Sequence, residues 1–589
     1  MSQDFAPVES ILALDCGSTT TQAFLIDQVA GEYRLVVRTE APSTVEPPWN
    51  NVATSVRQAV TEISEITGWP LLNERGHIIS PQRHLGGVDA VVMIASASNP
   101  LRLVLAGLMR DISLLSARRA LSTTYAIVEG VISLDRQDNG ARGIGGDIQG
   151  QISLIQQLQP DAIVIVGGID GGASRAVLQA AEAVAIASVT MLSGDRPPIL
   201  YAGNAHLRSQ VAEIVGPEAE LRAVDNVRPS LHLENLGPLQ AEAEELYVKR
   251  KMERLPGFAT ISAWSSVSVL PAAKAFAYAV QYLARLDGIN VLGVDAGGAT
   301  VTVAAVVDDR LDLIIRSDLG LSYSASRLLD QVPVESISRW LPLEVDPNEI
   351  RNLLHNKTIH YRTVPQTPQE LLIEQAVTRE MLRLTVSDLV PHWPQGTSRL
   401  YPNLLPKFHL IVGGGGALIN TPNYGQAALM LLDALQPIGV AGLALDKVRM
   451  MAPLSAVAMV NPAAAAQLME RDALLNLGTV VAPAGIAREG EIALTLKIEY
   501  EDGRQLEVEV PYGTLEMIPL PAGQTANLEL RPTRRFDVGL GTRGQAGTTR
   551  VEGGILGIII DARGRPLPIS QDPKEQRERM QRWLWDMGS

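Results

Sequence analysis

The chain contains 589 residues, carries a net charge of −14 and has a single cysteine. The acidic balance argues against a protein that binds the phosphate backbone of nucleic acid, because such proteins need a basic surface. One cysteine excludes a disulfide framework and a thiolate metal cluster, and it suits a reducing compartment. The length predicts several domains.

The sequence shows neither an export signal nor a membrane segment. The first ten residues contain acids but no basic region and no long apolar core, so we expect no secretory signal peptide. No segment reaches the ~18 uninterrupted apolar residues of a membrane helix. We therefore expect a cytoplasmic protein without membrane contact.

Continuous apolar, β-branched runs alternate with helical patterns over most of the chain. Such runs are typical of strands that are covered on both faces, and their alternation with helices predicts an α/β fold. The runs are residues 11–14, 90–95, 162–166, 199–202, 291–294 and 409–412. Helices are predicted at residues 173–187 and 271–286, and over most of residues 333–392. Residues 40–51 and 396–406 read as polar connections punctuated by proline.

The pattern changes near residue 483. From Glu491 apolar and polar residues alternate with period two, and Asp502-Gly503 between two such runs is a strong hairpin signal. We therefore predict a β domain over residues 483–566, followed by an amphipathic helix at residues 573–587 that carries Trp583 and Trp585. This helix is expected to pack on the β domain, with docking of a partner as the alternative.

Three glycine-containing turns carry the chemistry. In the first, an apolar strand ends at Asp15 and a second strand follows the turn. Tight glycine turns let backbone N–H groups approach a phosphate, and a carboxylate at the strand end can hold Mg²⁺ through water. An ordinary hairpin rich in small polar residues is the alternative. The candidate residues are Asp15, Gly17, Ser18, Thr19 and Thr20.

The second turn repeats the first arrangement far along the chain, and such a pair is more specific than either turn alone. Its residues are Asp295, Gly297, Gly298, Ala299 and Thr300. The third turn follows an apolar strand, where glycines let the backbone lie flat against a nucleoside. Its residues are Gly413, Gly414, Gly415 and Gly416.

The order of these motifs resembles the phosphate-one, phosphate-two and adenosine motifs of the actin, heat-shock chaperone and sugar-kinase ATPase superfamily. The resemblance includes two connecting helices, for which residues 271–286 and 453–460 are candidates. It implies a two-lobed actin-like ATPase fold. With the alternation that begins at Glu491, we expect an α/β chain that has this fold, an inserted α/β domain and a C-terminal all-β domain. The expected boundaries are 1–135 for the first half, 136–255 for the insertion, 256–482 for the second half with a helical subdomain at about 326–395, and 483–589 for the β domain.

Over residues 11–467 the chain resembles, more narrowly, the glutamate mutase L family of MutL-type accessory proteins, which is unrelated to the mismatch-repair MutL. The matching segments include residues 39–45 (TEAPSTV), 225–229 (DNVRP) and 317–324 (SDLGLSYS). The resemblance implies an ATP-dependent chaperone or reactivating factor for an adenosylcobalamin-dependent carbon-skeleton mutase.

The resemblance also implies roles for individual residues. Asp15 and the first turn would contact the water ligands of Mg²⁺ and the β-phosphate of ATP. Asp295 and the second turn would lie on the metal and γ-phosphate side, and the third turn would hold adenosine. The heat-shock chaperones use a lysine near the γ-phosphate that has no identified equivalent here. No histidine lies in an Asp-x-His-x-x-Gly context, so we expect the partner subunits, and not this chain, to bind cobalamin.

Two other functions stay open at this point. A small-molecule kinase of the same superfamily would need a catalytic aspartate, for which Asp147, Asp161 and Asp170 are available. A nucleotide-binding scaffold without turnover is the other. The loop at residues 167–172 (GGIDGG) is either an anion site at a helix start or a tight turn with Asp170 in the N-cap region.

Overall fold

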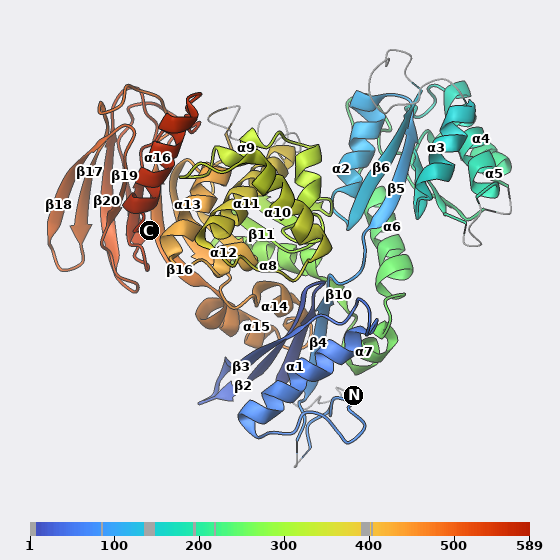
Figure 1. Cartoon of the computed structure of the whole chain (residues 1–589), viewed down its shortest axis with the longest axis horizontal. Helices are drawn as coiled ribbons and strands as arrows, with labels where there is room; N and C mark the ends of the chain where they lie inside the picture. Colours follow the sequence, from blue (N-terminus) through green and yellow to red (C-terminus); the bar gives the residue numbers. More distant parts are fainter. Residues whose placement is uncertain are drawn as a thin grey trace. The chain divides into compact units, whose positions relative to one another are not determined.

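The computed structural model describes residues 8–83, 86–134, 148–191, 196–216, 219–389, 401 and 404–588. The chain divides into two compact units. The first contains Met1–Ala97, Pro256–Ile314 and Asp318–Ser589, and the second contains Ser98–Leu255 and Ile315–Ser317. Figure 1 shows the elements of both and labels many of them.

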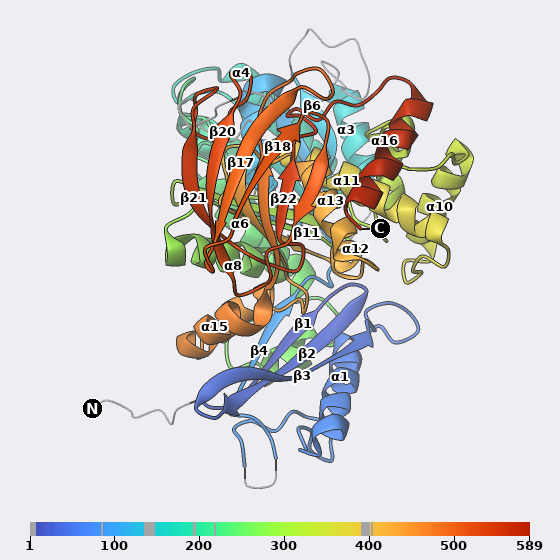
Figure 2. The same ribbon diagram turned by 90° about the vertical axis from the view of Figure 1, so that its left-hand side faces the viewer.

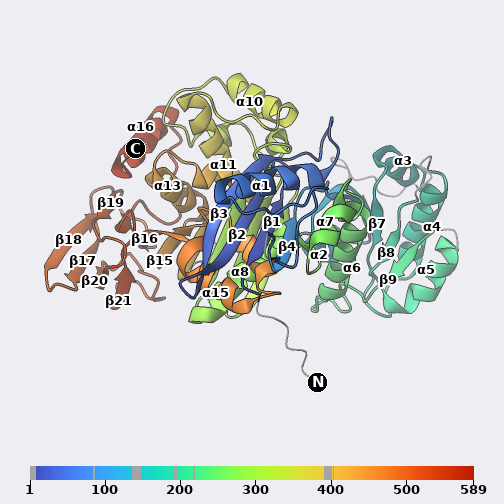
Figure 3. The same cartoon turned by 90° about the horizontal axis from the view of Figure 1, so that it is seen from below.

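The first sheet of the first unit has the strand order β10-β4-β1-β2-β3. Its central strand β1 is antiparallel to β2 and parallel to β4, and helix α1 (Val52–Thr67) packs on β2 and β3 (Figure 3). The strands are β1 (Ile11–Cys16), β2 (Thr20–Val29), β3 (Glu32–Pro42), β4 (Ala90–Ala95) and β10 (Leu270–Pro271). The apolar runs at residues 11–14 and 90–95 therefore form adjacent buried strands, as predicted.

The second sheet repeats this arrangement. Its first five strands have the order β13-β12-β11-β14-β15, with β11 antiparallel to β12 and parallel to β14. They are β11 (Val291–Ala296), β12 (Val301–Val307), β13 (Arg310–Arg316), β14 (Leu410–Gly414) and β15 (Gly439–Leu445). The two halves therefore share one topology, although their sequences differ.

Two helices join the halves. Helix α8 (Ala272–Asp287) packs on β11 and β12, and helix α14 (Met451–Val457) packs on β1, β4 and α8. One hydrophobic core contains Val92 of the first sheet, Val306 of the second, Val280 of α8 and Leu454 of α14. Both connecting helices predicted from the sequence are confirmed. The chain has the fold of the actin-like ATPases.

Helices cover the other face of the second sheet, and helices were predicted over much of this stretch. They are η4 (Ala325–Asp330), α9 (Glu335–Ser338), α10 (Pro347–Ile359), α11 (Pro368–Leu389), α12 (Gly416–Ile419) and α13 (Tyr424–Leu435). After α14 follow α15 (Pro462–Leu468) and η6 (Met469–Ala473), and α7 (Phe258–Trp264) precedes α8. Most of the expected connection at residues 396–406 lies outside the described residues.

The C-terminal strands continue the second sheet. Beyond β15 it gains β16 (Leu475–Ala482), β22 (Ile558–Asp561) and β19 (Leu515–Ile518). A four-stranded antiparallel sheet stacks on this extension (Figure 2) and shares a hydrophobic core with it. Its strands are β17 (Ile492–Tyr500), β18 (Gln505–Pro511), β20 (Thr525–Pro532) and β21 (Gly547–Glu552). The predicted hairpin at Asp502-Gly503 joins β17 to β18 and is confirmed.

The β region is consequently not a free-standing module. Its strands β22 and β19 hydrogen-bond into the sheet of the second ATPase half. The predicted terminal helix is α16 (Pro573–Asp586), which packs on α13 of that half as well as on β19. Trp583 is buried in this contact, whereas Trp585 is 67% exposed.

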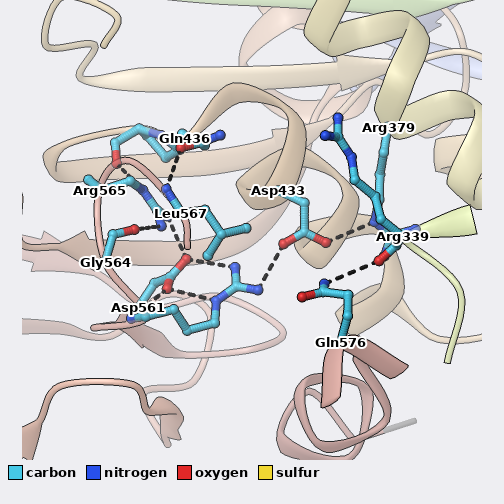
Figure 4. A network of polar contacts seen from close by, with 11 residues as sticks. Arg339, Arg379, Asp433, Gln436, Asp561, Gly564, Arg565, Leu567 and Gln576 are labelled. Atoms are coloured by element: carbon cyan, nitrogen blue, oxygen red, sulfur yellow. Dashed lines mark hydrogen bonds and ion pairs between the residues drawn. The ribbon is translucent and has the colours of Figure 1, made fainter. Parts of the chain in front are cut away.

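A buried chain of ion pairs reinforces this join (Figure 4). Asp433 of α13 accepts from Arg379 of α11 and from Arg563, both at 2.8 Å. Arg563 and Arg565 both donate to Asp561 at the end of β22. The five side chains are at most 2% exposed. Burial alone would raise the pKa of Asp561, but the two guanidinium groups outweigh it and lower the pKa.

The second unit contains five parallel strands in the order β6-β5-β7-β8-β9. They are β5 (Leu101–Gly107), β6 (Ala126–Ser133), β7 (Ala162–Ile165), β8 (Ile199–Tyr201) and β9 (Leu221–Ala223). Its helices are η1 (Arg110–Leu114), α2 (Leu115–Leu121), α3 (Ile148–Leu158), α4 (Arg175–Val189), η2 (Ala205–Leu207), α5 (Arg208–Val215), α6 (Gly237–Tyr247) and η3 (Val248–Met252). The strands predicted at residues 162–166 and 199–202 are β7 and β8.

This unit begins earlier in the chain than the insertion expected at residue 136. Strands β5 and β6, expected in the first ATPase half, belong to the second unit because β5 pairs with β7. The expected boundary itself falls at residues 135–147, outside the described residues.

Candidate nucleotide site

The first turn is a tight hairpin between β1 and β2. The N–H of Gly17 donates to the carbonyl oxygen of Thr20 at 3.0 Å, and Asp15 pairs with Gln22 across the strands. A Cβ atom at Gly17 would lie 2.6 Å from that carbonyl oxygen, so a side chain there would push the turn open. Glycine at this position therefore fixes the shape of the turn.

The second turn, between β11 and β12, has the same geometry. Gly297 donates to the carbonyl oxygen of Thr300 at 2.9 Å, and Asp295 pairs with Thr302. A Cβ atom at Gly298 would lie 3.0 Å from Cγ2 of Thr19, which places the two turns in van der Waals contact. Two Asp-x-Gly-x-x-Thr hairpins therefore meet at one place in the first unit.

The backbone of both turns offers unused donors. Two successive N–H groups in each hairpin donate no hydrogen bond to any acceptor in the described part of the chain. They belong to Ser18 and Thr19 in the first hairpin and to Gly298 and Ala299 in the second. Successive N–H groups of this kind form a concave site for an anion. The hairpins can therefore bind phosphate oxygens from two sides.

The third turn reaches the second hairpin, but its four glycines differ. Gly414 lies opposite Asp295 in the β11–β14 pairing, and a Cβ atom there would be 3.0 Å from Oδ1 of Asp295. Gly415 has φ +94°, and a Cβ atom would lie 2.2 Å from the carbonyl oxygen of Ala296. Gly413 packs against leucine side chains, whereas a Cβ atom at Gly416 would meet only the side chain of Asn420, at 3.9 Å. The roles of these residues in nucleotide binding stay predictions.

Two residues that the motif analysis did not single out complete the site. Asp446 follows β15, and its carboxylate accepts from the N–H groups of Met450 and Met451 at 2.8 and 3.2 Å, at the start of α14. Arg449 lies between Asp446 and Met450 in the chain and has φ +60°. The sequence did contain a signal that could have identified Asp446: it is an acidic residue that follows an apolar strand and directly precedes the second connecting helix.

Arg449 points to the first hairpin. Its Nη1 donates to Oγ1 of Thr20 at 3.4 Å. With the Gln22 amide oriented to satisfy its neighbours, the amide oxygen accepts from Nη1 of Arg449 at 2.6 Å. The guanidinium thus supplies a positive charge near the first hairpin. The ammonium of Lys447 instead donates to the carbonyl oxygen of Ile419.

The charge of Arg449 acts on three buried carboxyl groups. Burial raises the pKa of Asp15 to about 6, with Arg449 lowering it and Asp295 raising it. Burial also raises the pKa of Asp295 against the opposing charge of Arg449. Burial raises the pKa of Asp446 to about 7, against hydrogen bonds from Met450 and Met451 that lower it. A cation at this position would stabilise the charged form of these carboxyl groups.

The donor set fits Mg²⁺. Oδ1 of Asp15 is buried and has no hydrogen-bond partner, so it is available to the cation or its water ligands. No group of three or more metal-ligating side chains occurs among the residues that the structure describes. Mg²⁺ commonly uses one or two carboxylates together with phosphate and water, so Asp15 and Asp295 suffice as candidates.

The aspartates considered for a kinase have other partners in the second unit. Asp161 pairs with Lys251 at 2.7 Å. Asp170 accepts from the N–H of Ala205 at 2.8 Å and from Asn226 at 2.9 Å, so it cross-links two loops, and Ser174 is the N-cap of α4. Asp147 lies outside the described residues.

The family model described as MutL protein matches residues 11–473. The chain belongs to this family. Among its relatives, Protein MutL of Clostridium tetanomorphum is 24% identical over 360 residues, which cover 56% of this chain and 73% of that protein. Among the described residues, no helix of this MutL-family chain is long and apolar enough to cross a membrane.

Solved structures also match the chain. Nucleotide-free acetone carboxylase is 12% identical with a TM-score of 0.33, and the match covers 86% of this chain and 81% of that one. Glycerol kinase of Plasmodium falciparum with ADP is 10% identical with a TM-score of 0.30, covering 80% and 95%. Glycerol dehydratase reactivase is 11% identical with a TM-score of 0.27, covering 72% and 94%.

Proposed function

We propose that the protein binds Mg–ATP between its two hairpins and hydrolyses it, as an accessory protein of an adenosylcobalamin-dependent carbon-skeleton mutase of the glutamate mutase type. One observation carries the nucleotide part of this proposal. Two opposed Asp-x-Gly-x-x-Thr hairpins present free backbone N–H groups beside buried carboxyl groups, one of which has an unpartnered oxygen. Such a site suits a metal-bound polyphosphate.

Each part of the site has a defined task in this proposal. The N–H groups of Ser18, Thr19, Gly298 and Ala299 bind phosphate oxygens and stabilise charge on the transferring phosphoryl group. Asp15 and Asp295 would hold Mg²⁺, which supplies charge neutralisation on the phosphates. Asp295, on the second hairpin, is our candidate for orienting the attacking water.

The partner part rests on family membership. The chain belongs to the MutL family, and its resemblance to the glutamate mutase L proteins extends over most of the two ATPase halves. We infer that the nucleotide cycle changes the angle between the halves, a hinge motion. This motion would release a damaged cobalamin from the mutase, and this chain would not itself bind the cobalamin.

The deciding experiment measures ADP release from Mg–ATP by the purified chain with no acceptor. The wild-type protein is compared with Asp295→Asn and with Asp309→Asn, a control in the same half whose carboxylate is 70% exposed. We expect turnover that Asp295→Asn lowers at least about a hundredfold, as for loss of one electrostatic group, and that Asp309→Asn leaves unchanged.

Other outcomes would change the assignment. Tight nucleotide binding without turnover would support the scaffold, and ADP release that depends on an added acceptor would support the kinase. Absence of nucleotide binding would rule out the site. The partner role is tested by adding the protein and Mg–ATP to an inactivated mutase with fresh adenosylcobalamin, where recovery must fail with Asp295→Asn.

A further inference from the structure

A loop of the first half is fastened to the first hairpin. The N–H of Ser43 donates to the carbonyl oxygen of Thr19 at 2.9 Å. Thr44 closes the base of the loop, because its hydroxyl donates to the carbonyl oxygen of Asn51 at 2.6 Å and its own carbonyl accepts from Asn51 at 2.8 Å. Trp49 sits near the end of this loop with its side chain half exposed. A displacement of the loop would therefore be felt directly at Thr19.

A segment of the second half is fastened to the second hairpin in the same way. Leu321 donates to the carbonyl oxygen of Gly297 at 3.0 Å, and Ser322 donates to that of Gly298 at 2.7 Å. The next residue, Tyr323, stacks on Tyr361 with ring centroids 4.2 Å apart. Tyr361 belongs to the connection between α10 and α11, so this connection is coupled to the second hairpin.

Arg362 joins the two sides. Its guanidinium lies 5.5 Å from the ring of Tyr361 and 5.6 Å from the ring of Trp49, and it also donates to the carbonyl oxygen of Ser43. Beside it, the hydroxyl of Tyr323 donates to the carbonyl oxygen of Ser18 at 3.3 Å. We call Trp49, Arg362, Tyr361 and Tyr323 the clasp, because they link the halves next to both phosphate turns.

The contacts of the clasp are weak enough to break reversibly. Its cation–π contacts are exposed, and such contacts are individually weak. A hollow of about 390 Å³, lined by Pro47 and residues 359–363, adjoins the clasp, so the two sides do not interlock as a packed core does. The join can therefore break without disturbing either half.

We propose that the clasp gates the nucleotide site, and that nucleotide enters and leaves only when Arg362 disengages from Trp49 and Ser43. This inference rests on the proposed function, since it assigns a regulation to that same site. A gate lowers the rates of entry and exit together, because both are scaled by the fraction of open molecules. A direct ligand contact, in contrast, lowers the exit rate alone.

The test measures association and dissociation of a fluorescent ADP analogue by stopped flow. Arg362→Ala is compared with wild type and with Arg351→Ala, an exposed arginine on α10 of the same subdomain. We expect Arg362→Ala to raise both rates about tenfold, as for loss of a contact of this kind, with a dissociation constant changed less than about threefold. Arg351→Ala should leave both rates unchanged.

Aromatic variants of Trp49 make the test specific. Trp49→Phe keeps a ring for the guanidinium and should behave like wild type, whereas Trp49→Ala should resemble Arg362→Ala. Unchanged rates in Arg362→Ala, or faster dissociation alone, would overturn the gate while leaving the nucleotide site intact. Failure of the proposed function would appear earlier, as absence of analogue binding by the unaltered chain, and would remove both proposals.

Discussion

Arg449 illustrates how one residue can organise this site. A non-glycine residue at φ +60° is strained, and the strain is tolerated where surrounding contacts fix the conformation. Here Asp446 anchors the start of α14 on one side, while Thr20 and Gln22 receive the guanidinium on the other. The strained backbone conformation of Arg449 is therefore the one that directs its guanidinium to the first hairpin.

Asp446 gives the site a pH dependence. Burial raises the pKa of its carboxyl group to about 7, whereas in the unfolded chain it would be near 4. Between these values the folded chain keeps a proton that the unfolded chain has lost, so the contribution of this group to stability falls as pH rises.

We therefore expect the free energy of unfolding of the metal-free wild-type protein to fall more than that of the Asp446→Asn variant as the pH rises from about 5 to about 8. The difference should be of the order of 2 kcal/mol, since each pKa unit corresponds to about 1.4 kcal/mol. Urea unfolding at a series of pH values measures it, with Asp309→Asn as the exposed control. Parallel pH profiles for wild type and Asp446→Asn would contradict this assignment.

At the scale of elements, the junction of β14 and α12 shows two neighbouring glycines with different constraints. Gly415 adopts φ +94° and touches the backbone of Ala296, whereas a Cβ atom at Gly416 would meet only Asn420, at 3.9 Å. The close approach brings the Gly run against the second hairpin. Glycine is thus required at one position and replaceable at the next.

This difference predicts opposite results for two adjacent substitutions. Gly415→Ala should destabilise the protein by more than about 2 kcal/mol and weaken nucleotide binding, because strain and a backbone clash add. Gly416→Ala should be neutral or stabilising by up to about 1 kcal/mol, because alanine favours a helix start over glycine. Thermal unfolding and nucleotide titration of both variants check this. Equal losses in the two would refute it.

At the scale of the whole molecule, the C-terminal strands belong to the second half of the actin-like fold. They extend its sheet through β16, β22 and β19, and the buried ion pairs of Asp433, Arg563 and Asp561 cross the join. We therefore expect these strands to move with the second half during a nucleotide cycle. They can carry its motion to a partner surface.

Breaking the network should test this coupling. Asp433→Asn leaves Arg379 and Arg563 without their shared carboxylate, and removing one partner of a buried pair costs about 3–5 kcal/mol. Asp502→Asn removes an exposed pair with Arg504 and should leave the free energy of unfolding nearly unchanged, because water and salt screen exposed charges. Chemical denaturation compares the two. A cost for Asp433→Asn as small as that of Asp502→Asn would mean that the network does not hold the join.

The sequence patterns predicted those structural features that are specified by residues close together in the chain. The two Asp-x-Gly-x-x-Thr hairpins, the Gly run, both connecting helices and the hairpin at Asp502-Gly503 each depend on turn chemistry or on periodicity within a few residues. These signals are local, because a glycine turn or an amphipathic face is specified by the segment that forms it. The order of these motifs carried the resemblance that implied two similar halves.

Only the tertiary structure decided which distant residues meet. Arg449 reaches Thr20 across more than four hundred residues, Arg362 reaches Trp49 and Ser43, and Asp433 reaches Arg563. The same holds for strands: β5 joins the second unit by pairing with β7, and β22 joins the ATPase sheet by pairing with β16. The energy of such contacts depends on burial and on the partner, and neither is encoded in the local pattern of the segment.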